Sequence, residues 1–178
     1  AFDRGVNFFD TADAYGEGYG EEILSKSLGR QRHEIVIATK FGYDFYNSPR
    51  RVGHQERTQR FEPTFISYAC EQSLRRLKTD YIDLYQLHWP NPSVPIGETM
   101  GAMDKLGEEG KVRFIGVSNF SARQLEEAQA ATSNKIVSNQ VQYSLTHRNI
   151  EGDLLPFCQQ HQITVIAHTP LAGGSLVS

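Results

Sequence analysis

The sequence contains few cysteines, only Cys70 and Cys158 among 178 residues. Neither lies in a Cys-x-x-Cys motif or in a Cys/His spacing typical of zinc sites, and two cysteines cannot build a disulfide framework. Both fall within helical patterns. We therefore expect two free structural thiols in a reducing compartment, which we take to be the cytoplasm.

The sequence also lacks an excess of positive charge and a long hydrophobic run. Its formal net charge is −3 at pH 7, which gives no electrostatic reason to expect a nucleic acid or an anionic membrane as a partner. Its apolar runs are far shorter than the about 20 residues of a membrane span. Four histidines share no metal-ligand spacing, so no metal site is expected from them: His33, His54, His147 and His161.

What the sequence does contain is an alternation of strands and helices. With 39% hydrophobic and 22% charged residues it suits one globular domain with a core. The expected strands are mostly apolar on both faces: Val6–Thr11, Glu34–Lys40, Tyr81–His88, Phe114–Ser118, Ile136–Tyr143 and Ile163–His168. The expected helices are Gly20–Leu28, Pro63–Leu77, Ile96–Glu109, Ser121–Ala131 and Gly152–His161. This order predicts a parallel α/β sheet, either doubly wound or closed into a barrel.

Polar side chains recur at or near the carboxyl ends of the expected strands. In parallel α/β folds functional residues gather at that end. Lysine, histidine and glutamine are unusual choices for residues that would only form loops. The side chains concerned are Asp10, Lys40, His88, Ser118 with Asn119, Gln140 and His168.

An aspartate ends the first strand of this series and a lysine ends the second. Neighbouring strands lie about 4.8 Å apart, so Asp10 and Lys40 are expected to form an ion pair. Such a pair could serve only to set the strand register, and the pair alone does not exclude that alternative. Tyr15 follows five residues after Asp10. A nearby ammonium is expected to lower the pKa of this phenol toward neutrality and make it a proton donor, with His88 hydrogen-bonding the same oxygen.

Six ordered segments resemble the aldo-keto reductases: "GVNFFDTADAYG", "IATKFG", "YIDLYQLHWP", "IGVSNF", "NQVQYS" and "TPLAGG". The resemblance implies a (β/α)8 barrel that uses NADPH, or less often NADH, to reduce small aldehydes or ketones to alcohols. It also implies a catalytic tetrad. Tyr15 would protonate the carbonyl oxygen, Lys40 would lower the pKa of Tyr15, Asp10 would hold Lys40, and His88 would orient the substrate.

The resemblance further implies cofactor contacts. Ser118, Asn119 and Gln140 would hold the nicotinamide carboxamide, for which amide side chains offer both donors and acceptors. His168 occupies the position where the family usually stacks a tyrosine on the nicotinamide ring. Thr169 and Leu171 match positions along the cofactor, and the pair Gly173–Gly174 matches a loop near the pyrophosphate.

We expect residues 1–178 to form a single catalytic domain that is an incomplete barrel, truncated at both ends. Six strands are expected, whereas the barrel has eight, and the resemblance implies that the first and last are missing. The site for the 2′-phosphate would lie beyond Ser178, so the sequence does not distinguish NADP from NAD. Exposed strand edges would make the isolated chain insoluble or oligomeric and a poor binder of NADPH.

"GEGYG" at positions 16–20 fails the GxGxxG dinucleotide pattern, and its acidic residues suit a helix N-terminus better than a pyrophosphate. The segment Phe41–Glu62 is either a solvated loop or part of the substrate pocket. Its aromatic candidates, together with one from the next strand end, are Tyr43, Phe45, Tyr46 and Trp89. A cofactor-binding regulatory subunit on the same fold is the main rival function, and a barrel hydrolase lacks the paired carboxylates it would need.

Overall fold

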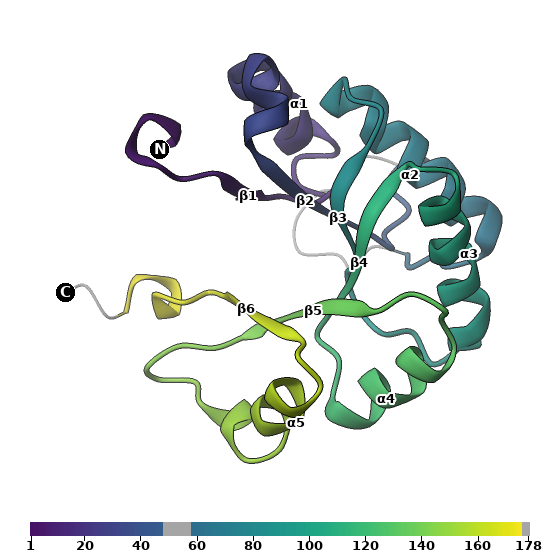
Figure 1. The fold of residues 1–178 in the computed structure, drawn as a ribbon, viewed down its shortest axis with the longest axis vertical. Helices are drawn as coiled ribbons and strands as arrows, with labels where there is room; N and C mark the ends of the chain where they lie inside the picture. The colour runs from purple at the N-terminus through teal and green to yellow at the C-terminus, as the bar shows by residue number, and fades with distance from the viewer. Residues whose placement is uncertain (48–57, 176–178) are drawn as a thin grey trace.

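The computed structural model describes residues 1–47 and 58–175, whose strands form one six-stranded parallel sheet. The strands lie side by side in chain order (Figure 1). They are β1 (Phe8–Asp10), β2 (Val36–Phe41), β3 (Ile82–Leu87), β4 (Val112–Ser118), β5 (Ile136–Gln142) and β6 (Thr164–His168). All six predicted strands and their parallel arrangement are confirmed, with ends that differ from the prediction by one or two residues.

Helices cover the convex face of the curved sheet (Figure 1). They are α1 (Tyr19–Leu28), α2 (Pro63–Leu77), α3 (Ile96–Glu108), α4 (Ala122–Ala130) and α5 (Leu154–Gln160). Short 3₁₀ helices span Phe2–Arg4, Gly29–Glu34, Asn149–Glu151 and Ala172–Gly174. Local sequence explains several starts: α2 begins with a proline, and Ser121 and Gln124 form the predicted capping box of α4. In the described part of the chain, no helix is long and apolar enough to span a bilayer.

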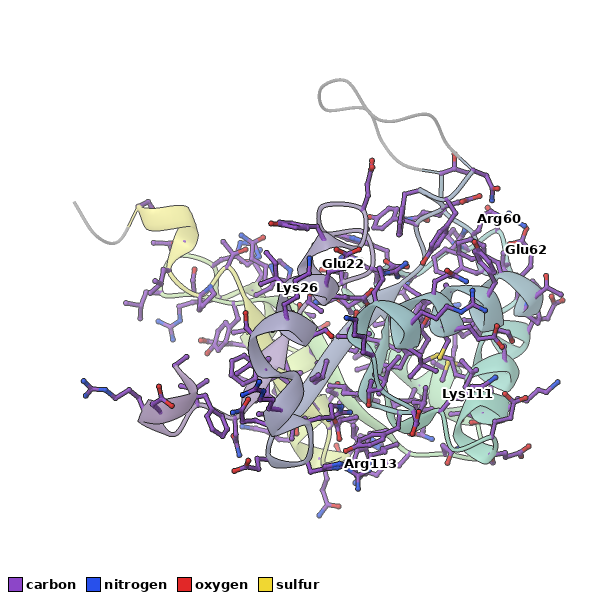
Figure 2. The ribbon with its side chains drawn as sticks, turned by 90° about the horizontal axis from the view of Figure 1, so that it is seen from above. Glu22, Lys26, Arg60, Glu62, Lys111 and Arg113 are labelled. Carbon is purple, nitrogen blue, oxygen red and sulfur yellow. The ribbon has the colours of Figure 1, made fainter. Side chains whose placement is uncertain are left out.

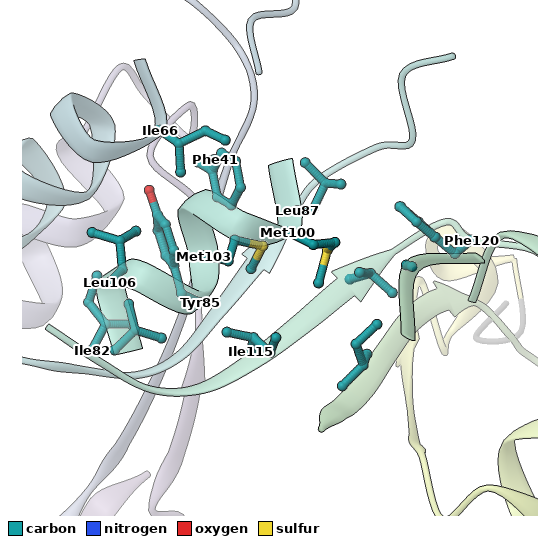
Figure 3. Close-up of a cluster of buried hydrophobic side chains, with 14 of the residues drawn as sticks. Phe41, Ile66, Ile82, Tyr85, Leu87, Met100, Met103, Leu106, Ile115 and Phe120 are labelled. Atoms are coloured by element: carbon teal, nitrogen blue, oxygen red, sulfur yellow. The ribbon is translucent and has the colours of Figure 1, made fainter. Parts of the chain in front are cut away.

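The main hydrophobic core lies between the sheet and helices α2 and α3 (Figure 3). Tyr85 of β3 is fully buried and stacks on Phe41 of β2, with ring centroids 4.7 Å apart. Met100 and Met103 of α3 pack into the same layer. Each such buried side chain stabilises the fold by about 1.5–3 kcal/mol, so this layer holds the strands firmly beneath the residues at their ends.

The concave face of the sheet is apolar near the amino ends of the strands and polar near their carboxyl ends. Near the amino ends of the strands it is apolar and contains a pocket of about 440 Å³, lined by residues that include Phe8, Leu84, Phe114 and Ile166. Near the carboxyl ends it carries buried polar side chains, among them Lys40. Among the described strands, β1 pairs only with β2 and β6 only with β5.

Ion pairs on this fold fall into exposed and buried groups. Figure 2 labels residues of exposed pairs such as Glu22 with Lys26 and Arg60 with Glu62, which contribute little to stability. Glu21 belongs to the buried group. The sequence predicted only that it complements the N-terminus of a helix, and it does lie in the first turn of α1. However, its carboxylate is fully buried. It pairs with Arg76 of α2 at 2.7 Å and accepts a hydrogen bond from Thr39 of β2. These contacts attach α1 to the sheet and to α2.

Candidate active site

The carboxyl ends of β1 and β2 bring an acid and a lysine together. Lys40 Nζ donates to Asp10 Oδ2 at 2.5 Å and to the Thr11 carbonyl at 2.8 Å, which confirms the predicted ion pair. The Lys40 side chain is 1% exposed and that of Asp10 is 27% exposed. Burial lowers the pKa of Lys40, and the negative charge of Asp10 counteracts part of that effect. The Asp10 carboxylate therefore stabilises the Lys40 ammonium, which is buried away from solvent.

Tyr15 lies on the turn between β1 and α1, against this pair. Lys40 Nζ lies 5.2 Å from the centroid of the Tyr15 ring, while its hydrogen bonds go to Asp10 and Thr11. The prediction of a lowered Tyr15 pKa is wrong for this structure, because burial and the charge of Asp10 raise it. The ammonium contacts the face of the ring and its charge is balanced by Asp10. The phenol consequently holds its proton at neutral pH.

The glycines of "GEGYG" shape the turn that carries Tyr15. Gly18 is the N-cap of α1 and has a φ of 96°, a left-handed conformation that favours glycine. A Cβ at this position would lie 2.5 Å from the Cδ atom of Arg76. The Gly20 amide donates to the Tyr15 carbonyl at 3.1 Å. These residues therefore have a structural role in positioning the phenol, which agrees with our rejection of a dinucleotide motif.

His88 follows β3 and lies between two tyrosines. Its ring meets those of Tyr15 and Tyr43 edge to face, with centroids 5.9 and 5.1 Å away. Nδ1 of His88 is buried and makes no hydrogen bond to the described residues. Burial and the positive charge of Lys40 lower the pKa of His88 to about 4. A neutral imidazole can donate a hydrogen bond to a small polar ligand, although not through the buried Nδ1.

The predicted cofactor residues on β4 and β5 form one connected group. Ser118 Oγ donates to the Gln140 carbonyl at 2.8 Å, and Asn119 Nδ2 lies 3.0 Å from Ser118 Oγ and 3.1 Å from the His88 carbonyl. Gln140 also donates through Nε2 to Asp10 Oδ1 at 2.9 Å, a link that the sequence did not predict. The amide-rich group is thus joined directly to the Asp10–Lys40 pair.

The residues after β6 extend this group toward solvent. His168 Nε2 lies 3.2 Å from Asn119 Oδ1, and its Nδ1 lies 3.1 Å from Thr169 Oγ1. Thr169 has a φ of 55°, a left-handed conformation that a β-branched residue adopts at a cost of about 1–3 kcal/mol and that is most frequent at functional sites. Leu171 is 63% exposed, and Gly173 and Gly174 both have positive φ. The structure places His168 beside Asn119 and leaves Leu171 on the surface.

The loop after β2 borders the site through the residues nearest the strand. Tyr43 contacts His88, and Phe45 stacks on Tyr46, with centroids 4.1 Å apart. Trp89 is 41% exposed at the end of β3. The rest of this loop, residues 48–57 with His54, lies outside the described residues. The predicted choice between a solvated loop and a substrate-lining one stays open for that part.

The donor and acceptor groups of this site are of the kind that a nicotinamide carboxamide requires. Ser118, Asn119 and Gln140 carry hydroxyl and amide groups of the kind that pair with a carboxamide, and in this structure these groups hydrogen-bond one another, the His88 carbonyl and Asp10. His168 supplies a half-buried ring next to them. By contrast, the described residues contain no group of three or more His, Cys, Asp or Glu side chains that could hold a metal ion.

Sequence reasoning missed one side chain of this site, Gln86. It lies on β3 and donates through Nε2 to Asp10 Oδ1 at 3.2 Å. The available signal was a glutamine among the apolar and aromatic residues of "LYQL", in a strand buried on both faces that leaves no solvent for an amide.

Comparisons with known proteins agree with this geometry. A family model described as "Aldo/keto reductase family" matches residues 1–178. The chain is 40% identical over 178 residues to the aldo-keto reductase YhdN of Bacillus subtilis, covering 99% of this chain and 51% of that protein. It thus spans about half the length of the curated relatives it matches.

Solved structures give the same result. The glycerol dehydrogenase AKR11B4 of Gluconobacter oxydans superposes with a TM-score of 0.89 at 35% identity, over 97% of this chain and 52% of that one. An aldo/keto reductase of Klebsiella pneumoniae, solved with NADP and acetate, superposes with a TM-score of 0.80 at 38% identity, over 99% and 57% of the two chains.

Proposed function

The chain belongs to the aldo/keto reductase family, and from that premise we propose that this protein reduces aldehydes or ketones to alcohols with NADPH, or with NADH as the alternative donor. The observation that carries the proposal is the convergence of Asp10, Tyr15, Lys40 and His88 at the carboxyl ends of three neighbouring strands. In this proposal residues 1–178 belong to a single catalytic domain.

Each member of the tetrad has a role that its surroundings support. Tyr15 keeps its proton at neutral pH and gives it to the carbonyl oxygen as negative charge develops there. Lys40, held by Asp10, places a positive charge 5.2 Å from the centre of the Tyr15 ring, where negative charge is left once the proton has moved. His88 is neutral and donates a hydrogen bond that orients the carbonyl.

The cofactor half of the proposal rests on the group around Asn119. Ser118, Asn119 and Gln140 would hold the carboxamide of the nicotinamide, and His168 would stack on its ring. Thr169 and Leu171 would lie along the rest of the molecule. When bound, the reduced nicotinamide supplies the hydride that the carbonyl carbon accepts. The NADP in the Klebsiella pneumoniae structure supports the choice of cofactor.

We also place the protein in the cytoplasm. The support is that Cys70 and Cys158 are both free and buried, as in proteins of reducing compartments. The rival function, a regulatory subunit that binds cofactor without turnover, is not favoured, because such a role does not require a complete tetrad.

The decisive experiment replaces the proton donor. In Tyr15→Phe, turnover of a reactive aldehyde should fall by about 10²–10⁴-fold, while the NADPH dissociation constant changes little. Tyr19→Phe is the matched control, because Tyr19 is 58% exposed on α1 and its ring lies beside the Lys26 ammonium, with Nζ 6.0 Å from the ring centroid. Unchanged turnover in Tyr15→Phe would overturn the mechanism. Tight NADPH binding by the unmodified protein without turnover of any carbonyl would favour the regulatory role.

A further inference from the structure

Gln86 is a buried amide in a position where a hydrophobic residue would pack well. It is fully buried on β3, and its Cα pairs in register with that of Lys40 on β2. Residues paired in this way point to the same face of a parallel sheet, so both side chains lie on the concave face. Its Oε1 atom is buried and has no hydrogen-bond partner among the described residues. An unsatisfied buried carbonyl destabilises a fold, so a compensating role for the amide group is expected.

The role is visible in the hydrogen bonds of Asp10. Oδ2 of Asp10 accepts from Lys40, while Oδ1 accepts from Gln86 at 3.2 Å and from Gln140 at 2.9 Å. The Asp10 carboxylate on β1 thus accepts hydrogen bonds from side chains on three other strands, β2, β3 and β5. Two amides on one oxygen fix the rotation of the carboxylate, which leaves the other oxygen facing Lys40.

A glycine on the neighbouring strand makes room for this arrangement. Gly116 of β4 is the register partner of both Gln86 and Ser138. A Cβ on Gly116 would lie 3.2 Å from the Cγ atom of Gln86 and 2.4 Å from Ser138 Oγ. A larger residue would clash with Ser138 and crowd Gln86, so the absence of a side chain at Gly116 leaves room for the observed amide position.

We propose that Gln86 is a positioning residue that holds the Asp10 carboxylate, and through it the Lys40 ammonium, in the orientation that supports Tyr15. This inference rests on the reductase function proposed above and extends it to a residue outside the tetrad. Gln86 touches neither substrate nor cofactor in this scheme. Its effect passes through the Asp10–Lys40 pair.

The first test removes the amide. Gln86→Leu keeps a side chain of similar size and should lower kcat about ten- to a hundredfold, the usual effect of losing a hydrogen bond to a charged group. The dissociation constant of NADPH should stay within about twofold. Ser138→Ala is the matched control, because Ser138 is buried on the same face and its Oγ has no hydrogen-bond partner among the described residues. This control should keep wild-type kcat.

The second test separates positioning from packing. In Gln86→Glu, a protonated carboxyl can still donate to Asp10, whereas an ionised one repels it. Activity relative to wild type should therefore fall as pH rises, while the relative activity of Gln86→Leu stays constant. The titratable groups that face Lys40 in this site are the same in all variants: Asp10, Asp13, Tyr15, His88 and His168.

The outcomes distinguish the two proposals. An active wild type with an equally active Gln86→Leu variant overturns the role of Gln86 and leaves the reductase function standing. A loss that appears only in NADPH binding, or a relative activity of Gln86→Glu that is independent of pH, also overturns it. A wild-type protein that binds NADPH but turns over no carbonyl overturns the proposed function itself.

Discussion

The low pKa of His88 makes folding stability depend on pH in a defined window. The pKa of His88 falls from its ordinary value of 6.5 to about 4 in the folded protein, because burial and Lys40 oppose a second positive charge. Between these two values the unfolded chain binds more protons than the folded one, so the free energy of unfolding rises with pH. The stabilisation is complete above pH of about 6.5 and is lost as pH falls through about 4.

The magnitude follows from the shift. At about 1.4 kcal/mol per pKa unit, the maximal effect is about 3 kcal/mol, and about 2 kcal/mol of it should be lost between pH 7 and pH 4.5. That is a large part of the 5–15 kcal/mol that typically stabilises a domain. Other carboxylates and histidines titrate in the same range, so only a comparison with a variant isolates the contribution of His88.

The assay is urea unfolding of wild type and His88→Gln at pH 7, 5.5 and 4.5. The stability of wild type relative to the variant should decrease by about 2 kcal/mol from pH 7 to pH 4.5. His33→Gln, at an exposed histidine, controls for general charge effects. If the difference between wild type and His88→Gln does not change with pH, His88 is not held neutral in the folded site. Its proposed role as a neutral hydrogen-bond donor then fails as well.

Two further predictions concern His168 and the buried ion pair between Glu21 and Arg76. His168→Tyr should bind NADPH about two- to tenfold more tightly in a fluorescence titration, because a larger ring buries more area against the nicotinamide; equal or weaker binding would show that His168 is not a stacking partner. Glu21→Ala should lower the free energy of urea unfolding by about 3–5 kcal/mol, because it leaves the Arg76 charge without its partner. Glu22→Ala, in the exposed pair with Lys26, should cost less than about 1 kcal/mol, and equal losses in the two variants would show that burial of Glu21 adds nothing.

The positions of the site residues followed from the sequence because parallel strands have simple rules. A strand buried on both faces is recognisable by its apolar run, and its carboxyl end is where polar residues gather. Once Asp10 and Lys40 were assigned to the ends of successive strands, their ion pair required only the spacing between strands. The positions of the remaining polar residues at strand ends were read in the same way, and their roles came from the resemblance to the aldo-keto reductases.

What the sequence could not supply were directions of side chains within that neighbourhood. The pKa of Tyr15 depends on whether Lys40 faces its hydroxyl group or its ring, and the structure shows the ring. Gln86 and Gln140 reach Asp10 across the concave face, which no local pattern specifies. The burial of Glu21 depends on Arg76, 55 residues away on another helix.

The bond between Gln140 and Asp10 has a consequence for the order of folding events. It joins the first and fifth strands of the sheet, across 130 positions of sequence. Neighbouring strands are each joined by one crossover, whereas this contact requires all the strands and crossovers between β1 and β5 to be assembled and curved, at a larger cost in loop-closure entropy. We therefore expect the hydrogen bonds of the carboxylate at the centre of the site to be completed late, after the sheet around it. A chain that had folded only through β4 would carry Asp10, Tyr15, Lys40 and His88 without the amide of Gln140 that restrains Asp10.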